Sequence, residues 1–329
     1  MNKQTETFIK NLLITAGIFM VLPAFVGDYN MTILTMFFIW AIVALAWNLL
    51  LGFSNIWAFG NLVFFAVGGY TAAYLSLKMG IPPVLGLIAG GCAGAIAGII
   101  IGVPTLRLKM IYLALFTFSA EEFLRNLVVL PEFSPYTGGP IGLQFIPQFK
   151  LFNISFLILH YYLGLFLFLL SVSFTWWVEN SKIGLALRAI AGSEEAAEAI
   201  GVNTYKYKTL AFLVSAFITG IAGAFYSYYF GSITSGALSF ELLVSIIFMI
   251  VVGGEYSFSG PIIGALVLTF LDEYMRSHIG GLMSNVRLIV MGAIIIGTLL
   301  KYPAGLIGFV KQTWSKIKIN ILSENSTEK

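Results

Sequence analysis

The sequence predicts an all-α membrane protein, a polytopic bundle of about ten transmembrane helices with both termini in the cytoplasm. Of its 329 residues, 59% are hydrophobic and only 10% are charged, whereas a soluble domain carries about 25% charged residues. The apolar residues come in runs close to the roughly 20 residues that a helix needs to cross a bilayer. Barrel strands alternate apolar and polar residues instead, and within lipid a long apolar run pairs its backbone polar groups only as a helix.

Ten runs are predicted to span the membrane as one transmembrane domain over residues 1–329. The first is interpreted as a membrane helix and not as a signal peptide, because no small-x-small cleavage site follows it and a second long run starts at Met31. The stretch from Gly52 to Gly60 interrupts the pattern and is expected to be broken or re-entrant. The predicted spans are residues 8–27, 31–51, 61–77, 83–103, 109–130, 156–178, 208–229, 240–254, 260–277 and 286–301.

The positive charges support this order of spans, because lysine and arginine gather in cytoplasmic loops. With an even number of spans, thirteen of the 18 lysines and arginines fall on the side of the termini and five on the other side. The termini, a loop at residues 179–207 and a tail at residues 302–329 are therefore expected in the cytoplasm. A Pro- and Gly-rich loop at residues 131–150 is expected on the outer face.

The cytoplasmic loop predicts a short helix of about seven residues outside the lipid. Ser193 is a good N-cap, and Glu194 and Glu195 complement the dipole of the first turn. Three alanines favour the helix, and Gly201 closes it. The small alanine face is open to close approach by another protein, although a solvated connecting helix is the alternative. The residues that define this predicted helix and its small surface are Ser193, Glu194, Glu195, Ala196, Ala197 and Gly201.

Polar residues within apolar spans are costly, and they tend to face a cavity or a partner. Glu121 and Glu122 stand at helical spacing from Arg125, so this group either neutralises itself on one helix face or serves the transport path. Glu255 either caps a helix or belongs to an inner gate. His160 and His278 are expected at the outer interface. The transport-path candidates are Asn48, Ser54, Asn55, Asn61, Glu121, Glu122 and Glu255.

Glycines recur every fourth residue from Gly86 to Gly98, which predicts a smooth helix face for close packing. Packing of this face within the chain is favoured over contact with another subunit. No Walker A, HExxH or GxSxG pattern occurs, and Cys92 is the only cysteine. We therefore expect no catalytic set, no metal site, no disulfide and no cofactor in this chain. The small net charge of +3 gives no reason to expect a nucleic-acid partner.

Several stretches in a fixed order resemble the LivM-type permease of branched-chain amino-acid ABC importers, a group with relatives for urea and amides. The resemblance covers residues 32–308. The chain departs from the pattern at Ser54, Asn55, Asn61, Glu255 and Tyr256. The stretches are LLLGFSNIWAFGNLVFFAVGGYTAAY, YLALFTFSAEEFLRN, TGGPIGL, GLALRAIAGSEEAAEAIGVN, VVGGEYSFSGPIIGA and YPAGLIG.

The resemblance implies a subunit of the plasma (inner) membrane whose coupling helix docks into a groove on an ATPase. It implies two ATP-binding-cassette ATPase subunits, which bind the ATP, a second and related permease subunit, and an extracytoplasmic substrate-binding protein. Thr137, Gly138 and Gly139 are then expected to meet the binding protein. One alternative is an ion-coupled secondary transporter that uses Glu121 and Glu122. Another is a membrane-embedded enzyme, which the two distant histidines argue against.

Overall fold

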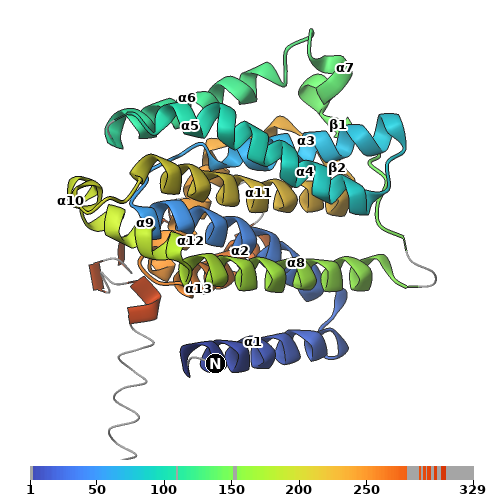
Figure 1. Cartoon of the computed structure of the whole chain (residues 1–329). Helices are drawn as coiled ribbons and strands as arrows, with labels where there is room; N and C mark the ends of the chain where they lie inside the picture. The colour runs from blue at the N-terminus through green and yellow to red at the C-terminus, as the bar shows by residue number, and fades with distance from the viewer. Residues whose placement is uncertain are drawn as a thin grey trace, which may run out of the picture. The chain divides into compact units, whose positions relative to one another are not determined.

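The computed structural model describes residues 3–108, 110–150 and 154–279, followed only by residues 289, 292–293, 295–297, 300–301 and 305–308. The chain divides into two compact units, Met1–Val244 and Ser245–Lys329, and each is described by itself (Figure 1). Half of the tenth predicted span and most of the predicted C-terminal tail lie outside the described residues. The single permease domain stays a prediction.

The described chain is helical, apart from one antiparallel pair of two-residue strands. The predicted helical class is therefore confirmed. The main helices are α1 (Lys3–Val21), α2 (Asp28–Ser54), α3 (Asn61–Met79), α4 (Pro83–Ala97), α6 (Met110–Leu127), α8 (Phe156–Glu179), α11 (Thr204–Phe230), α12 (Phe240–Gly253) and α13 (Gly260–Ile279). The short elements are η1 (Leu22–Ala24), the π-helical η2 (Gly98–Gly102), α5 (Val103–Thr105), α7 (Ser134–Thr137), η3 (Gly139–Ile141), β1 (Leu143–Gln144), α9 (Lys182–Gly192), α10 (Glu194–Ala199), β2 (Ser232–Ile233) and η4 (Ser235–Leu238).

Six helical segments among the described residues are long and apolar enough to cross a membrane. They are Thr5–Ala24, Asp28–Ser54, Asn61–Met79, Pro83–Thr105, Phe156–Glu179 and Thr204–Phe230, and each coincides with a predicted span. Three further predicted spans, 109–130, 240–254 and 260–277, coincide with α6, α12 and α13. The total of ten spans and the side on which the termini lie stay predictions.

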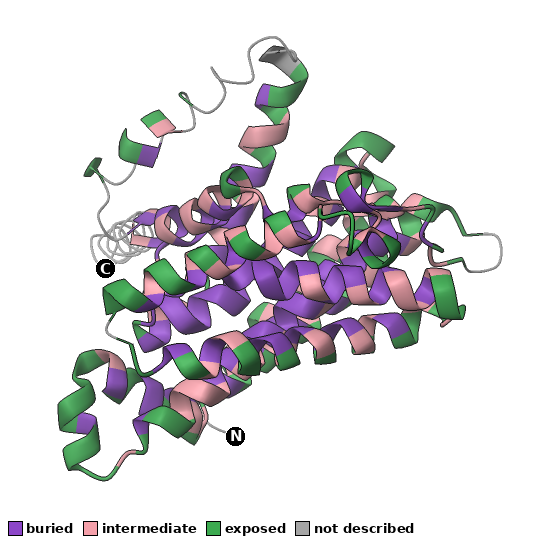
Figure 2. Ribbon diagram, turned by 90° about the horizontal axis from the view of Figure 1, so that it is seen from above, coloured by how far each residue is buried: buried purple, intermediate pink, exposed green. Residues whose placement is uncertain are grey.

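Helix α2 is the most deeply buried element of the first unit. Every residue from Phe37 to Leu50 is buried, and Figure 2 shows the purple ribbon of buried residues in the interior. Helix α2 packs against α8 and α11. Phe37 and Phe38 lie against Phe168 of α8, with ring centroids 5.7 and 5.5 Å apart. A helix that is apolar all round is expected in such a place.

The glycine face of α4 packs within the subunit, which confirms the favoured interpretation. A Cβ atom added to Gly94 would lie 2.6 Å from the carbonyl oxygen of Ala216 on α11. A Cβ atom added to Gly90 would lie 2.7 Å from the Cβ of Ala224 and 2.8 Å from the carbonyl oxygen of Gly68 on α3. Only glycine therefore permits these helices to approach so closely.

Successive helices of the first unit run antiparallel, so their connections gather at two ends. The beginning of α1 lies at the same end as α9 and α10, while α7, β1 and β2 lie at the opposite end (Figure 1). The pairing of Phe8 with Trp176, whose ring centroids are 4.1 Å apart, links the start of α1 to the last turn of α8. This arrangement agrees with the predicted grouping of the N-terminus and the 179–207 loop on one side.

The side chain of His160 is fully buried within the protein, and its place at the outer interface stays a prediction. Its Nδ1 hydrogen donates to the carbonyl oxygen of Phe156 over 2.9 Å. The rings of Phe149 and Tyr229 lie 5.9 and 5.7 Å from its imidazole. Tyr229 comes from α11, 69 positions later in the chain, a contact that local sequence does not reveal. The side chain of His278 lies outside the described residues.

In the second unit, α12 and α13 cross at glycines of the stretch VVGGEYSFSGPIIGA. A Cβ atom added to Gly264 would collide with the carbonyl oxygen of Met249, and one added to Gly253 would collide with that of Gly260. Gly254 adopts a φ of +115° between the helices, a conformation that side chains rarely permit. These glycines therefore serve the tight connection between α12 and α13.

Candidate functional site

The loop between α8 and α11 contains the predicted short helix, here α10. The Ser193 side chain accepts a hydrogen bond from the backbone N–H of Ala196 over 3.3 Å, as an N-cap does. Glu194 and Glu195 lie in the first turn, and Gly201 follows with a φ of +88°. The predicted cap and helix are confirmed, with six helical residues instead of about seven.

The exposed surface of this loop differs from the predicted alanine face. Ala197 is only 2% exposed, so it packs inside the chain and does not face a partner. Ala196 is exposed, but the larger exposed apolar groups are Ile200 at 78% and Leu185 of α9 at 71%. The sequence analysis missed both residues. A bulky aliphatic side chain in a loop expected outside the lipid was the available signal.

Polar contacts hold α10 on the first turns of α11. Lys208 forms an ion pair with Glu194, and the Thr204 hydroxyl donates to the Glu198 carboxylate over 2.6 Å. The Asn203 side chain caps α11 by accepting from the N–H of Lys206 over 3.0 Å. These contacts attach the short helix α10 to the membrane-length helix α11.

The predicted break between α2 and α3 is present at residues 55–60, and it is held from both sides. Asn55 ends α2 in the left-handed conformation, with a φ of +50°. The indole N–H of Trp47 donates to the carbonyl oxygen of Ala58 over 2.7 Å. The N–H of Phe59 donates to the Thr117 hydroxyl of α6 over 2.9 Å. Backbone groups that leave the helices are thus paired within the protein, as burial requires.

The four polar candidates around this break do not converge on one place. Ser54 donates to the carbonyl oxygen of Leu49 within α2, and Asn55 is exposed and accepts from Trp57. Asn48 is fully buried in α2. Asn61 connects two helices, through two polar residues of α11. Its amide donates to Thr219 over 3.2 Å and accepts from Ser215 over 3.3 Å.

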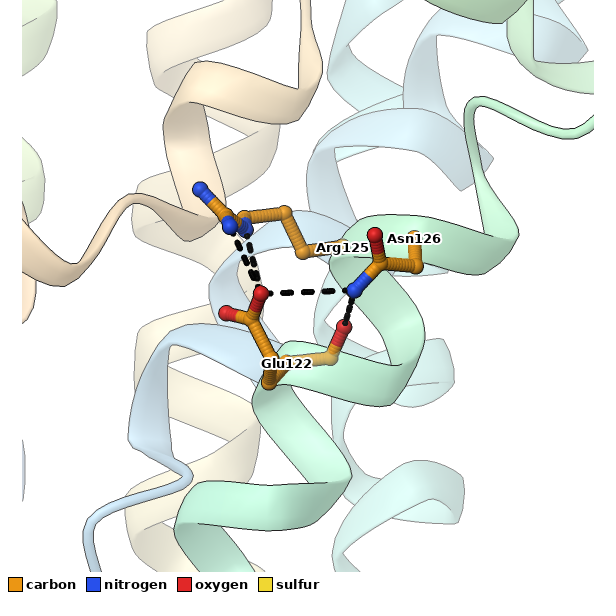
Figure 3. A network of polar contacts seen from close by, with 3 residues as sticks. All are labelled: Glu122, Arg125 and Asn126. Atoms are coloured by element: carbon orange, nitrogen blue, oxygen red, sulfur yellow. Dashed lines mark hydrogen bonds and ion pairs between the residues drawn. The ribbon is translucent and has the colours of Figure 1, made fainter.

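The two neighbouring glutamates of α6, Glu121 and Glu122, lie in different environments. Arg125 donates to Glu122 from Nη2 over 2.6 Å and from Nε over 3.2 Å, and Asn126 donates to the same carboxylate oxygen over 3.3 Å (Figure 3). The predicted self-neutralising pair is confirmed for Glu122. Glu121 is 2% exposed, and its Oε2 has no hydrogen-bond partner within the described part of the chain.

Glu255 lies in the second unit, in the connection between α12 and α13, and it is partly exposed. The neighbouring Tyr256 is 77% exposed. A hydrogen bond to Glu255, together with its negative charge, raises the pKa of the Tyr256 phenol. This pairing at the surface of the loop gives no support to either the cap or the gate that the sequence suggested.

The outer-loop residues Thr137, Gly138 and Gly139 shape the loop and expose little surface. The Thr137 hydroxyl donates to the carbonyl oxygen of Val128 over 2.6 Å, and Gly138 and Gly139 both have positive φ. Thr137 and Gly139 are buried and Gly138 is partly exposed, and their contact with a binding protein stays a prediction. The exposed apolar groups nearby are Ile141 at 73% and Phe145 at 94%, the latter at a φ of +58°.

The first unit also contains a cavity of about 750 Å³ between α3, α4 with η2, and α6. Its lining is apolar except for Ser119, and it includes the side chains of Val63, Ile100, Phe116 and Phe123. None of the predicted transport-path residues lines it. It therefore does not provide a polar path through the bilayer.

A model of the family "Branched-chain amino acid transport system / permease component" matches residues 29–299. The LivM permease protein of the high-affinity branched-chain amino acid transport system of Salmonella typhimurium is 27% identical, over 92% of this chain and 75% of that protein. Its counterpart in Escherichia coli is 26% identical, over 87% and 71%. The ribose import permease protein RbsC of Haemophilus influenzae is 26% identical, over 83% and 85%.

No solved structure matches the chain significantly. The family match begins after the membrane-length segment Thr5–Ala24 and, from residue 29 onward, takes in the other five. This makes the protein a multi-pass membrane permease and not an enzyme. The chain belongs to the family of permease components of branched-chain amino acid transport systems.

Proposed function

We propose that this chain is the membrane subunit of an ATP-binding-cassette importer for branched-chain amino acids, driven by ATP that a partner hydrolyses. Permeases of this family serve amino acids or sugars, as the names of the relatives state. The amino-acid permeases LivM cover more of the chain than the ribose permease does. A permease for urea or amides is the alternative within the same family.

The observation that carries the proposal is the α9–α10 loop. It exposes Leu185 and Ile200 together with the acidic first turn of α10, while Lys208 and Thr204 fix it to α11. An exposed apolar pair with charged neighbours suits a protein interface. In the proposed assembly this loop faces the cytoplasm and docks on one of two ATPase subunits. A second permease subunit and an extracytoplasmic binding protein complete the importer.

An ion-coupled transporter is the competing proposal, and Glu121 is the observation in its favour. It is a buried carboxyl group whose Oε2 has no partner in the described residues, and such groups in membrane proteins mark ion paths. Glu122 does not add to this case because Arg125 neutralises it. The two proposals differ in their need for ATP.

The test is purification of the protein from its native membrane with its bound subunits, followed by reconstitution into proteoliposomes. An ATPase is expected to co-purify, and leucine uptake is expected only with enclosed ATP and the binding protein. Uptake of urea in place of leucine would identify the alternative substrate class. Uptake that follows an ion gradient without ATP would refute the importer and favour the ion-coupled transporter.

A further inference from the structure

The junction between α8 and α9 is a sharply defined elbow, residues 179–184. Only two residues separate the helices. The Ser181 hydroxyl donates to the carbonyl oxygen of Val178 over 2.7 Å and accepts from the N–H of Ile183 over 3.1 Å. A Cβ atom added to Gly184 would collide with the carbonyl oxygen of Glu179. Hydrogen bonds and close backbone contact therefore fix the start of α9 against the end of α8.

An ion pair closes the elbow one turn further along α9. Arg188 Nη2 donates to Glu179 Oε1 over 2.9 Å and to the Glu179 carbonyl oxygen over 3.2 Å. The Glu179 side chain is only 14% exposed, and its Oε2 is buried without a partner in the described chain. Arg188 is thus the cation that compensates a largely buried carboxylate. Removal of one member of such a pair costs far more than removal of both.

The inner face of α9 connects the elbow to the core of the bundle. Leu187 and Ile190, spaced three residues apart, are buried at 0% and 5% exposure, and α9 packs against α2 and α11. Leu185, on the other face, is exposed. Helix α9 therefore lies between the exposed loop surface and the most deeply buried helix, α2.

We infer that Glu179 and Arg188 form a positioning pair that makes α9 a rigid lever between the coupling loop and the membrane helices. The inference rests on the proposed function, because it assigns the lever to the motion of the ATPase. With the pair intact, a displacement of α10 moves α9, α8 and α2 together. Without it, α9 pivots about residues 180–181, and the displacement does not reach α2.

The test compares ATP hydrolysis with leucine uptake in the same proteoliposomes, using the assembled importer. In Arg188→Gln, the amount of ATP hydrolysed per leucine transported is expected to rise about tenfold, the scale of a typical coupling energy between sites. ATPase co-purification is expected to remain. The double variant Glu179→Gln/Arg188→Gln leaves no buried charge uncompensated but also lacks the pair, so it is expected to be more stable than Arg188→Gln and to show the same rise in the ratio.

Arg276→Gln is the matched control, because Arg276 forms an ion pair with Glu273 within α13 over 3.6 Å and is 64% exposed. It is expected to leave the ratio unchanged. If Arg188→Gln fails to assemble, Arg188→Lys keeps the charge, and an intermediate ratio is expected. A wild-type ratio of ATP hydrolysed to leucine transported in Arg188→Gln and Arg188→Lys overturns the inference. Loss of ATPase binding by the folded Arg188→Gln protein also overturns it. Failure of the wild-type protein to bind an ATPase refutes the proposed function instead.

Discussion

Replacement of Ile200 by serine tests whether the exposed apolar surface of the coupling loop is a docking site. Complete burial of an isoleucine side chain stabilises a complex by about 1.5–3 kcal/mol. Ile200 is 78% exposed, so a partner that covers it gains about 2 kcal/mol from this side chain. A loss of about 2 kcal/mol weakens binding roughly 30-fold. The exposed side chain adds little to the fold, so stability is expected to change by less than about 0.5 kcal/mol.

The assay is a titration of the purified ATPase subunit against the permease in nanodiscs. The expected result is the 30-fold rise in Kd, with the thermal unfolding temperature unchanged. Phe25→Ser is the matched control, because Phe25 is 84% exposed and lies after η1, far along the sequence from the coupling loop. A Kd within threefold of wild type for Ile200→Ser would refute the docking argument. Equal weakening by both variants would show that the effect is not specific to the loop.

Three further variants test the fold and the outer surface. Gly94→Val is expected to destabilise the protein by about 1–3 kcal/mol in thermal unfolding. Gly17→Val is the control and is expected to have little effect, because nothing lies within 4 Å of the added Cβ. Equal stability of the two variants would contradict the packing argument. Thr117→Val leaves the N–H of Phe59 without its acceptor and is expected to cost about 1–3 kcal/mol; an unchanged midpoint of unfolding would argue against this bond. Phe145→Ser is expected to lower the stimulation of ATP hydrolysis by the binding protein without changing basal hydrolysis, and an unaltered response would place the contact elsewhere.

The helices were predictable because membrane burial is encoded in local composition. The predicted span 31–51 corresponds to Asp28–Ser54, and 208–229 corresponds to Thr204–Phe230. The observed helices extend past the apolar runs because polar residues such as Asn203 cap them outside the apolar part. Hydropathy marks the part of a helix that suits lipid, and capping residues mark its ends.

Local features of the site were also predictable, because they depend on residues that are close together in the sequence. The Ser193 cap and the Glu122–Arg125 pair depend on residues three positions apart. The burial of Ala197 was not predictable, because it depends on how α10 lies against the rest of the loop. The Glu179–Arg188 pair joins two helices across a turn, and the sequence of neither helix alone predicts it.

Contacts between distant segments explain the remaining differences. Leu143 pairs with Ile233, 90 positions later in the chain, and this strand pair holds the outer loop. The Thr137 hydroxyl is held by its bond to Val128, a contact that the Pro- and Gly-rich composition of the stretch does not specify. Glycine-rich sequence predicted a turn correctly, but only the tertiary structure distinguishes the residues that shape a turn from those that it exposes.

The central claim is that the α9–α10 loop lies in the cytoplasm and contacts an ATPase. Ala196 is exposed on α10, and Cys92 is the only natural cysteine. Ala196→Cys in a Cys92→Ala background therefore gives a single reactive site. The account predicts labelling by a membrane-impermeant thiol reagent in inside-out vesicles only, and protection when the ATPase is bound. Labelling from outside intact cells, or full reactivity in the assembled complex, would contradict it.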